Sequence, residues 1–503
     1  MLRAAFALAT GALLAIAFPA IGLWPVAFVA LVPLLSFAMR ASARRSFAAG
    51  FGAGLLLYVL AVPWIVNVMT HYGGIGGVTA VLVMLLLHAY LACYYGLFAA
   101  LLARAARRSK ALALGIAPPL WMGLEWVRNW LFSGFPWIPL GLSQWKDLPL
   151  LQHAEWGAVY AVSGIVVLAN AGLVALSMKE TRRLGTVALG IFAVFVLTGW
   201  HRLETWDARV SAMPRTLAVG VVQAMAPMEE RWDPESVDDI ERRHFDATHA
   251  LAGNGARLVL WSESSIPILG GFWKNPAYER RLGALVHREG VALIFGGTSH
   301  EYPGGREIIY NSAFAIDGDG RVAGRYDKQH LVPFGEYVPM QRLLFFAEKL
   351  VREVGDFGRG SGPAVLDVAG ARVGSPICYE IVFPEICRAF ENAGADLLIT
   401  LTNDAWFGHS AAAEQHFANA ALRAVETRRF FVRCANTGIS GVIAPSGRVE
   451  KRTPIFEEAT FVADVALLSG RTPYARTGDV LPIAGLVLGL IAALAPGRSG
   501  ASV

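Results

Sequence analysis

Long uncharged apolar runs, concentrated in residues 1–200, restrict the fold of this chain more than any other sequence feature. A transmembrane helix needs roughly 20 apolar residues to cross the hydrocarbon core of a bilayer. Seven runs meet this requirement, namely residues 4–21, 23–39, 47–69, 76–103, 156–178, 184–200 and 480–496. An eighth run, residues 111–127, is interrupted by Glu125. We therefore expect a polytopic α-helical membrane bundle of about eight spans.

The distribution of Lys and Arg favours the eighth span and sets an orientation. Positive residues collect on the cytoplasmic side of short loops, and here they cluster in residues 40–45, 104–110 and 179–183. All three clusters fall on one side only if residues 111–127 cross the membrane. Both termini are then cytoplasmic, and residues 201–475 lie on the outer face. Residues 4–21 are followed by no clear small-residue cleavage site, so we expect a retained span rather than a signal peptide.

The composition separates the chain into membrane and aqueous parts. With 55% hydrophobic and 17% charged residues, the chain is too apolar for an ordinary soluble protein. We predict a transmembrane bundle at residues 1–200 containing spans 1–7, an aqueous domain at 201–475, and a final span with a cytoplasmic tail at 476–503. The net charge of +5 comes mostly from cytoplasmic loops, so we expect no nucleic-acid partner.

The aqueous domain has the alternating pattern of an α/β fold. Short β-rich runs predict buried strands at residues 217–223, 257–261, 292–297, 308–316, 321–326, 373–378, 397–402 and 430–434. The stretches between them predict helices at residues 234–252, 276–288, 340–351, 383–393 and 411–427. Residues 317–320 read Asp-Gly-Asp-Gly, and Asp-Gly is a hairpin signal. We therefore expect a mixed sheet rather than an all-parallel one.

Three segments place an ionisable or nucleophilic residue at the end of a predicted buried strand, where the side chains of an α/β sheet converge. They carry Glu263, Lys328 and Cys378. A thiol attacks a carbonyl only as thiolate, so a catalytic Cys378 needs a base for its proton and positive charge for the oxyanion that follows. Glu263 offers the base and Lys328 the charge. A lone Cys is more often a small buried hydrophobe, but the shared placement favours a catalytic site.

The three segments resemble the Glu, Lys and Cys motifs of the nitrilase superfamily, which implies an αββα sandwich. Joined to a bundle of spans, they resemble the apolipoprotein N-acyltransferase family. This resemblance covers nearly the whole chain and rests on Phe-Pro-Trp at 135–137, His-Leu-Val-Pro-Phe-Gly-Glu-Tyr at 330–337, Ile-Cys-Tyr-Glu at 377–380 and Asn-Asp-Ala-Trp-Phe-Gly at 403–408. It implies Glu263 as general base, Lys328 as oxyanion stabiliser and Cys378 as acyl-accepting nucleophile.

The resemblance also implies supporting residues. Glu336 would orient Lys328 and the substrate amine. Tyr379 and Glu380 would support the site or its entrance, with ordinary strand-end packing as the alternative.

Four more residues would bind substrate. Trp232 matches a family position on an arm over the site, and Trp137 lies near the expected lipid entry, where an interfacial aromatic belt is an alternative explanation. Asn403 and Trp406 would bind substrate or shape the loop beside Cys378, and both interpretations stay open.

The same resemblance implies the substrates. A phospholipid would donate the acyl chain, and the α-amino group of the diacylglyceryl-modified N-terminal Cys of an apolipoprotein would accept it, with a Cys378 thioester between the two half-reactions. The enzyme would lie in the bacterial inner membrane with its catalytic domain in the periplasm. We expect a monomer.

Other chemistries have weaker support. The chain has no Gly-Lys-Ser/Thr phosphate loop, and neither His330 nor His416 belongs to a cluster with metal-ligand spacing, so we expect no cofactor and no metal. One disulfide among Cys378, Cys387 and Cys434 would be allowed in an oxidising compartment, but a bridge through Cys378 would consume the nucleophile.

Two other functions and one local ambiguity remain open. A membrane-tethered amidase would use the same three residues with water as acceptor. A transporter with an inert sensor domain is disfavoured, because the chain shows no inverted repeat. Glu125 and Arg128, at the end of the fifth predicted span, either pair with each other or meet a lipid headgroup.

Overall fold

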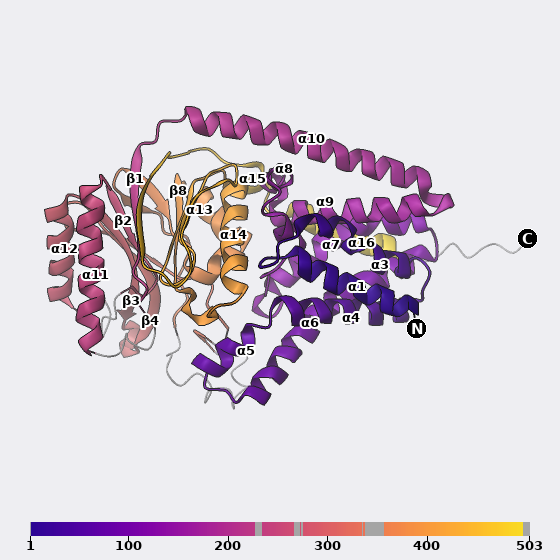
Figure 1. The fold of residues 1–503 in the computed structure, drawn as a ribbon, viewed down its shortest axis with the longest axis horizontal. Coiled ribbons are helices and arrows are strands. Elements are labelled where there is room, and N and C mark those ends of the chain that lie inside the picture. Colours follow the sequence, from indigo (N-terminus) through magenta and orange to yellow (C-terminus); the bar gives the residue numbers. More distant parts are fainter. Residues whose placement is uncertain are drawn as a thin grey trace, which may run out of the picture. The chain divides into compact units, whose positions relative to one another are not determined.

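The computed structural model describes residues 2–226, 234–265, 272, 275–333, 335–337 and 357–495. These residues form two compact units (Figure 1). The helical unit comprises Met1–Val66, Gly76–Glu204 and Thr477–Val503, and the α/β unit comprises Asn67–Ile75 and Thr205–Arg476. Trp232 and the helix predicted at residues 340–351 lie outside the described residues.

Helices occur at all eight predicted spans. They are α1 (Leu2–Ala17), α2 (Ala27–Ala30), α3 (Val32–Ala38), α4 (Ala43–Ala61), α6 (Gly77–Ala106), α7 (Lys110–Trp130), α9 (Ala154–Ser177), α10 (Arg182–Ala212) and α16 (Val480–Leu494). A short helix between two of the predicted spans is α8 (Leu148–Leu151). Among the described helices, three are long and apolar enough to cross a membrane, or four if one bent pair counts as a single span. The number of spans therefore stays a prediction.

The span predicted at residues 47–69 is not one straight helix. After α4 ends at Ala61, the chain bends by 61° into α5 (Ile65–Asn67) and a π-helical turn, η2 (Val68–Tyr72). Pro63 lies in this break. A proline has no backbone N–H and clashes with the preceding turn, so it interrupts a helix.

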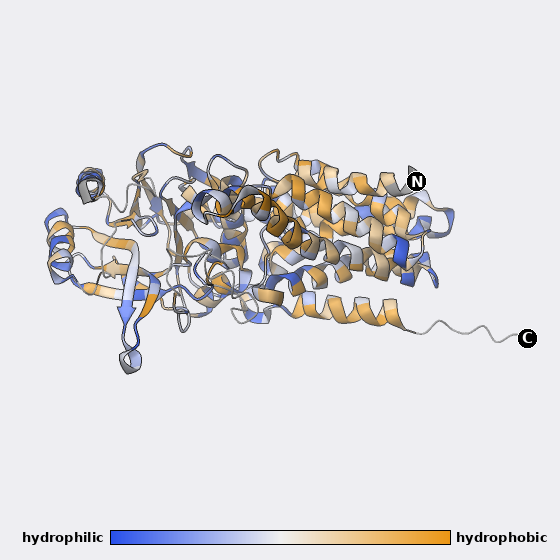
Figure 2. Cartoon of the chain, turned by 90° about the horizontal axis from the view of Figure 1, so that it is seen from below, coloured by the Kyte–Doolittle hydropathy of each residue, from blue (hydrophilic) through white to orange (hydrophobic). Residues whose placement is uncertain are grey.

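The outer faces of the helical unit are apolar (Figure 2). On α6, the side chains of Val78, Leu82 and Leu86 are 79%, 62% and 73% exposed. Exposed apolar surface of this extent marks a membrane or partner contact. Inside the unit, small residues allow close approach: a Cβ at Gly50 of α4 would overlap the backbone of Tyr95 of α6.

A buried ion pair lies at the end of α7. Arg128 Nη2 is 3.6 Å from Glu125 Oε1. The same carboxylate oxygen accepts from Leu140 N at 2.7 Å, and Arg128 Nη1 donates to Tyr58 Oη at 2.5 Å. Of the two sequence interpretations, the structure therefore has Glu125 and Arg128 paired with each other.

The three clusters of positive charge contribute side chains to one end of the helical unit. Lys110 Nζ donates to Glu180 Oε1 at 2.5 Å. The pKa of Glu180 is lowered chiefly by this hydrogen bond and to a smaller extent by the charge of Arg40. Arg104 and Arg108 donate to carbonyls at the C-terminal end of α16, at 3.1 Å and 2.7 Å. Residues from the 40–45, 104–110 and 179–183 loops thus lie together.

The α/β unit contains two six-stranded sheets, ordered β12-β1-β2-β3-β4-β5 and β11-β10-β9-β8-β7-β6. The first seven strands are β1 (Leu217–Gln223), β2 (Leu258–Trp261), β3 (Ala292–Glu301), β4 (Ile308–Ile316), β5 (Val322–Asp327), β6 (Leu366–Val368) and β7 (Ala371–Gly374). The others are β8 (Leu397–Thr402), β9 (Phe431–Ala435), β10 (Gly441–Ile443), β11 (Val449–Arg452) and β12 (Ala459–Val465). The prediction of mixed sheets is confirmed, because β1, β2 and β3 pair in parallel while β4 and β5 form an antiparallel hairpin.

Two pairs of helices cover the sheets. The pair α11 (Pro234–Gly253) and α12 (Pro276–Glu289) lies on the first sheet, and α13 (Pro384–Asn392) and α14 (Ala412–Thr427) lie on the second (Figure 1). A short helix, α15 (Pro473–Thr477), follows. The core beneath α11 and α12 includes Trp261, Leu282 and Phe295. The unit is therefore the αββα sandwich that the resemblance implied.

The prediction of a strand at residues 373–378 is wrong at the C-terminal end of that range. Its ladder ends at Gly374, two residues before Pro376, which has no N–H to donate. After one isolated bridge between Ile377 and Leu401, the chain enters the short helix η10 (Cys378–Val382). Cys378 thus lies in a turn rather than in a strand.

Candidate active site

The ends of three strands bring Glu263, Lys328 and Cys378 to one place. Glu263 follows β2 and Lys328 follows β5, both in the first sheet, whereas Cys378 follows β7 of the second sheet. The charges of Glu263 and Lys328 both act on the Cys378 thiol. The convergence expected from the sequence is therefore present.

Lys328 lies between two carboxylates. Its Nζ donates to Glu336 Oε1 at 2.9 Å and is 3.6 Å from Glu263 Oε1. The Lys328 side chain is 1% exposed. Burial disfavours its charge, but the carboxylates of Glu336 and Glu263 outweigh burial and hold the pKa of Lys328 above its usual value. Lys328 is therefore a permanent positive charge in a dry site.

Asn311, on β4, bridges the same two carboxylates and was not predicted. Its Nδ2 donates to Glu263 Oε1 and to Glu336 Oε1, both at 2.8 Å. Each hydrogen of the amide thus serves a different carboxylate. Glu336 is further fixed by Val332 N, which donates to its Oε2 at 2.8 Å.

The second oxygen of Glu263 meets the loop after β8. Asn403 N donates to Glu263 Oε2 at 2.9 Å. The Asn403 side chain caps η11 (Asp404–Phe407) by accepting from Ala405 N and also accepts from Asn436 Nδ2 at 3.2 Å. Asn403 therefore orients Glu263 through its backbone and shapes the loop through its side chain.

The Cys378 turn is conformationally unusual and buried. Its φ is +50°, in the left-handed region that residues other than glycine rarely occupy. The residue is 7% exposed. Burial raises the pKa of the Cys378 thiol, the charge of Glu263 raises it further, and Lys328 opposes both. The thiol is therefore protonated at rest and needs a base at the moment of attack.

Glu380 holds the Lys328 and Cys378 segments together. Its Oε1 accepts from Gln329 N and His330 N at 2.7 Å and 2.9 Å, and its Oε2 accepts from Ile377 N at 2.7 Å. Tyr326 Oη also donates to this carboxylate. Burial raises the pKa of Glu380 to about 7, against the lowering effect of the backbone donors. Glu380 therefore supports the site from inside rather than at an entrance.

The neighbouring aromatic residues have different surroundings. Tyr379 is 6% exposed, and its ring contacts those of His330 and Phe383. The ring of Trp406 packs edge-on against Tyr72, 4.9 Å away, and Tyr72 Oη donates to Ala405 O at 2.9 Å.

Trp137 belongs to the helical unit. It is 1% exposed and lies against Trp64, with ring centroids 4.8 Å apart.

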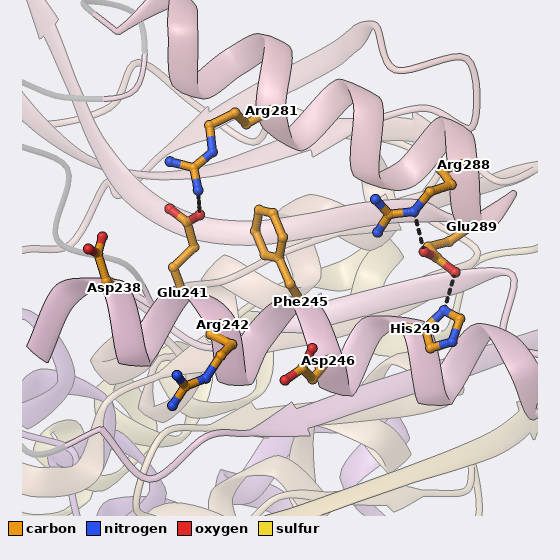
Figure 3. Close-up of a pocket in the computed structure, with 9 residues that line it drawn as sticks. All are labelled: Asp238, Glu241, Arg242, Phe245, Asp246, His249, Arg281, Arg288 and Glu289. Carbon is orange, nitrogen blue, oxygen red and sulfur yellow. Dashed lines mark hydrogen bonds and ion pairs between the residues drawn. The ribbon is translucent and has the colours of Figure 1, made fainter.

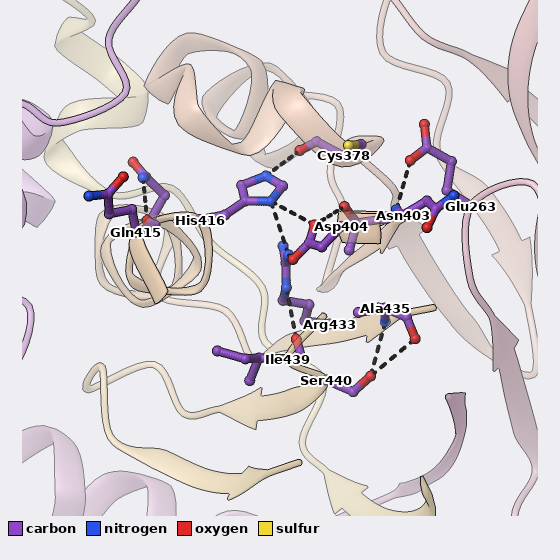
Figure 4. A network of polar contacts seen from close by, with 12 residues as sticks. Glu263, Cys378, Asn403, Asp404, Gln415, His416, Arg433, Ala435, Ile439 and Ser440 are labelled. Carbon is purple, nitrogen blue, oxygen red and sulfur yellow. Dashed lines mark hydrogen bonds and ion pairs between the residues drawn. The ribbon is translucent and has the colours of Figure 1, made fainter. Parts of the chain in front are cut away.

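A polar network lies behind the thiol (Figure 4). His416 Nε2 is 3.1 Å from Cys378 O. Asp404 joins this histidine to Arg433, which donates to Asp404 Oδ2 at 2.6 Å. Burial opposes ionisation, but Arg433 and His416 hold the pKa of Asp404 well below its usual value.

A groove on the α/β unit lies away from the Cys378 cluster. A hollow of about 960 Å³ separates α11 from α12 (Figure 3). Its charged residues are largely paired, as in Arg281 with Glu241 and Arg288 with Glu289. No residue of the Cys378 cluster lines it, so its size does not indicate the reactive site.

The cluster has the parts of an acyl-transfer site: a thiol, a carboxylate base and a buried cation. All four cysteines are unpaired thiols, Cys378 included. Within the described ranges, no group of three His, Cys, Asp or Glu side chains has an arrangement able to hold a metal ion.

Comparisons with known proteins agree with both units. Residues 215–472 match the carbon-nitrogen hydrolase family, and residues 10–172 match the apolipoprotein N-acyltransferase N-terminal domain. A protein of Geobacter metallireducens named apolipoprotein N-acyltransferase is 38% identical over 486 residues, covering 94% of this chain and 91% of that protein. One of Azotobacter vinelandii with the same name is 35% identical over 498 residues, covering 96% and 93%.

Proposed function

The chain belongs to the apolipoprotein N-acyltransferase family, and from this premise we propose the substrates and the residues that act on them. The enzyme transfers an acyl chain from a phospholipid to the α-amino group of the N-terminal diacylglyceryl-cysteine of an apolipoprotein. The observation that carries the assignment of residues is Lys328, held between Glu263 and Glu336 beside the Cys378 thiol.

In the first half-reaction, Glu263 takes the proton of the Cys378 thiol. The thiolate attacks the ester carbonyl carbon of the phospholipid, and a C–S bond forms. Lys328 stabilises the oxyanion of the tetrahedral intermediate. When this intermediate collapses, the C–O bond breaks and protonated Glu263 returns its proton to the departing lysophospholipid oxygen. A thioester on Cys378 remains.

In the second half-reaction, the acceptor amine attacks the thioester carbonyl carbon. Glu263 takes a proton from the amine as the C–N bond forms, and Lys328 again faces the oxyanion. The C–S bond then breaks, an N-acylated lipoprotein leaves, and the Cys378 thiolate regains its proton from Glu263. Glu336 orients Lys328 in both steps. The scheme is a ping-pong mechanism.

Exclusion of water favours transfer over hydrolysis. A thioester in a wet site would be lost to water, and a dry site also strengthens the charges within it. Glu263, Lys328 and Cys378 are 6%, 1% and 7% exposed. Membership of the apolipoprotein N-acyltransferase family supports an amine acceptor rather than the water of an amidase. Trp232, Trp137, Asn403 and Trp406 bind the substrates in this proposal, and Tyr379 and Glu380 support the site.

The membrane arrangement is part of the same proposal. Eight spans lie in the bacterial inner membrane, seven in residues 1–200 and one in residues 476–503 with the cytoplasmic tail. Residues 201–475 form the catalytic domain in the periplasm, and the enzyme acts as a monomer. The gathering of positive side chains at one end of the helical unit supports a common cytoplasmic side for the three loops.

A matched pair of acceptors tests the function. The purified enzyme is incubated with a phospholipid labelled in its acyl chains and a diacylglyceryl peptide whose α-amine is either free or acetylated. We expect labelled N-acyl peptide only with the free amine, and parallel lines in double-reciprocal plots of the two substrates. Labelled free fatty acid released equally with both peptides, without N-acyl product, would instead establish a hydrolase.

A further inference from the structure

The backbone of Cys378 is contacted by a residue of α14, His416. His416 is 0% exposed, and its Nε2 is 3.1 Å from Cys378 O. Cys378 itself has a φ of +50°. A left-handed conformation at a residue other than glycine persists only when its surroundings enforce it. The His416 contact therefore falls on a residue whose backbone conformation needs support from its surroundings.

The His416 ring is itself fixed by two charged residues (Figure 4). Its Nδ1 is 3.0 Å from Asp404 Oδ1 and 3.0 Å from Arg433 Nη2. Asp404 Oδ1 also accepts from Thr402 Oγ1 at 2.9 Å, and Arg433 Nε donates to Ile439 O at 2.9 Å. The Nδ1 side of the His416 ring is thus held by two groups that are themselves anchored elsewhere.

The hydrogen-bond network of His416, Asp404 and Arg433 requires a glycine at position 438. A Cβ at Gly438 would overlap the carboxylate of Asp404. Asp404 and Arg433 are 2% and 0% exposed. The network therefore has little freedom to rearrange.

The partners of the ring decide where its proton lies. A carbonyl oxygen only accepts, so the contact with Cys378 O requires a proton on Nε2. Arg433 only donates, and its approach to Nδ1 fits a neutral ring with the lone pair on Nδ1. A second proton, shared with Asp404, would give an imidazolium. In both states Nε2 carries the hydrogen that Cys378 O accepts.

We propose that His416 is a positioning residue of the acyl-transfer reaction: its Nε2–H holds the Cys378 carbonyl and so fixes the turn that presents the thiol to Glu263 and Lys328. Asp404 and Arg433 act on the same turn by fixing the ring. The inference rests on the proposed function, because it concerns the geometry of the nucleophile that the proposed chemistry uses.

Three substitutions separate positioning from packing. In His416→Gln the side-chain amide reaches as far as Nε2 and keeps a donor for Cys378 O. In His416→Asn the amide reaches only as far as Nδ1, so it faces Asp404 and Arg433 but not Cys378 O. His416→Leu fills the space without any donor.

The readout is thioester formation on Cys378 from phospholipid in a single turnover, with KM for phospholipid and the melting temperature measured alongside. We expect His416→Asn and His416→Leu to lower the rate about 10- to 100-fold, because a small misplacement of a reacting atom has effects of this size. Their KM should not change. His416→Gln should stay within about fivefold of the wild type, the range of a single neutral hydrogen bond.

His244→Gln is the matched control. His244 lies on α11, is 0% exposed, and has its Nδ1 2.8 Å from Ile240 O in the same helix. We expect it to change the melting temperature without changing the rate of thioester formation.

Equal rates for His416→Gln and His416→Asn would overturn the inference, and this pair decides even if His416→Leu does not fold. Failure of the wild type itself to form a thioester would overturn the proposed function and the inference with it. A wild-type thioester that also forms at full rate in His416→Asn would overturn the inference alone.

Discussion

Each unit of this chain buries a carboxylate beside a cation at the same separation, yet the two pairs have different surroundings. In the helical unit, Arg128 Nη2 lies 3.6 Å from Glu125 Oε1. In the α/β unit, Lys328 Nζ lies 3.6 Å from Glu263 Oε1. The first pair comes from a single turn of α7, whereas the second joins the ends of β2 and β5 and includes a further carboxylate, Glu336.

The two pairs also differ in how their remaining polar atoms are used. Glu125 Oε2 and Arg128 Nε have no hydrogen-bond partner within the described part of the chain. Both oxygens of Glu263 accept hydrogen bonds, from Asn311 and Asn403. The second pair adjoins the Cys378 thiol. A buried charge is thus not by itself a sign of catalysis. Distant segments that converge on one cation beside a thiol are a stronger sign.

Removal of the base should have the largest effect on activity and should separate the two regions. Glu263→Gln keeps the shape of the side chain but cannot take the Cys378 proton, so we expect the rate of acyl transfer to fall about 10²- to 10⁴-fold. Glu125→Gln should lower the melting temperature and leave kcat unchanged. Initial rates with labelled phospholipid, corrected for folded protein, measure both. Similar losses of kcat in the two variants would contradict a catalytic role that belongs to Glu263 and not to Glu125.

Removal of the Lys328 charge should have the second-largest effect on kcat. Lys328→Met takes away the positive charge that faces the oxyanion, and we expect a loss of about 10²- to 10³-fold in kcat. Arg128→Met leaves Glu125 buried without its partner, which should destabilise the helical unit by about 3–5 kcal/mol. Single-turnover rates and thermal unfolding separate these outcomes. The comparison fails if Arg128→Met lowers kcat per folded molecule as much as Lys328→Met does.

The side-chain amide of Asn311 should contribute less to kcat than the charge of Glu263 or of Lys328. Asn311→Leu removes the donor shared by Glu263 and Glu336, and we expect roughly a tenfold loss of kcat, as for a hydrogen bond to a charged group. Its counterpart in the helical unit is Asn170→Leu, since the Asn170 side chain also makes two buried hydrogen bonds, accepting from Leu31 N and donating to Ala27 O, both at 2.8 Å. That control should lose stability and keep kcat. Unchanged kcat in Asn311→Leu would remove Asn311 from the site.

The smallest expected effect is on the pH dependence of the melting temperature. Burial raises the pKa of Glu380 from 4.5 to about 7. A carboxyl that binds its proton more tightly when folded contributes stability below its unfolded pKa, and this contribution is lost as the pH rises through about 7. The melting temperature of the wild type should therefore fall as the pH rises from 4.5 to 7, and that of Glu380→Gln should fall less.

Part of that fall should remain in the variant, because burial raises the pKa of Glu391 to about 7 as well. Melting curves of wild type and Glu380→Gln across this pH range provide the check. An unchanged slope would show that Glu380 does not titrate there.

Local pattern predicted much of the fold. The predicted bounds of β1, β4 and β8 agree with the structure at both ends, because these strands are continuous runs of β-favouring residues with clear limits. The β4–β5 hairpin followed from its Asp-Gly turn. Four strands were missed, among them β11, whose sequence Val-Glu-Lys-Arg is mostly charged and exposed. Another, β12, pairs with β1 from the far end of the unit.

The sequence identified those candidate site residues that come directly after a predicted strand, as Glu263 and Lys328 do. Asn311 was missed because an asparagine within a strand carries no local signal, and its two partners lie 48 and 25 residues away. His416 was considered only as a metal ligand. Its position behind Cys378 depends on the packing of α14 against η10, which sequence spacing does not reveal.

The intact mass of the purified protein tests the central claim most directly. Wild type, Cys378→Ala and Glu125→Gln are incubated with phospholipid in the absence of an acceptor and then treated with or without neutral hydroxylamine, which cleaves thioesters. We expect an increment of one acyl chain on wild type and Glu125→Gln that hydroxylamine removes and that Cys378→Ala lacks. An acyl increment that persists in Cys378→Ala, or no increment on the wild type, would contradict this expectation.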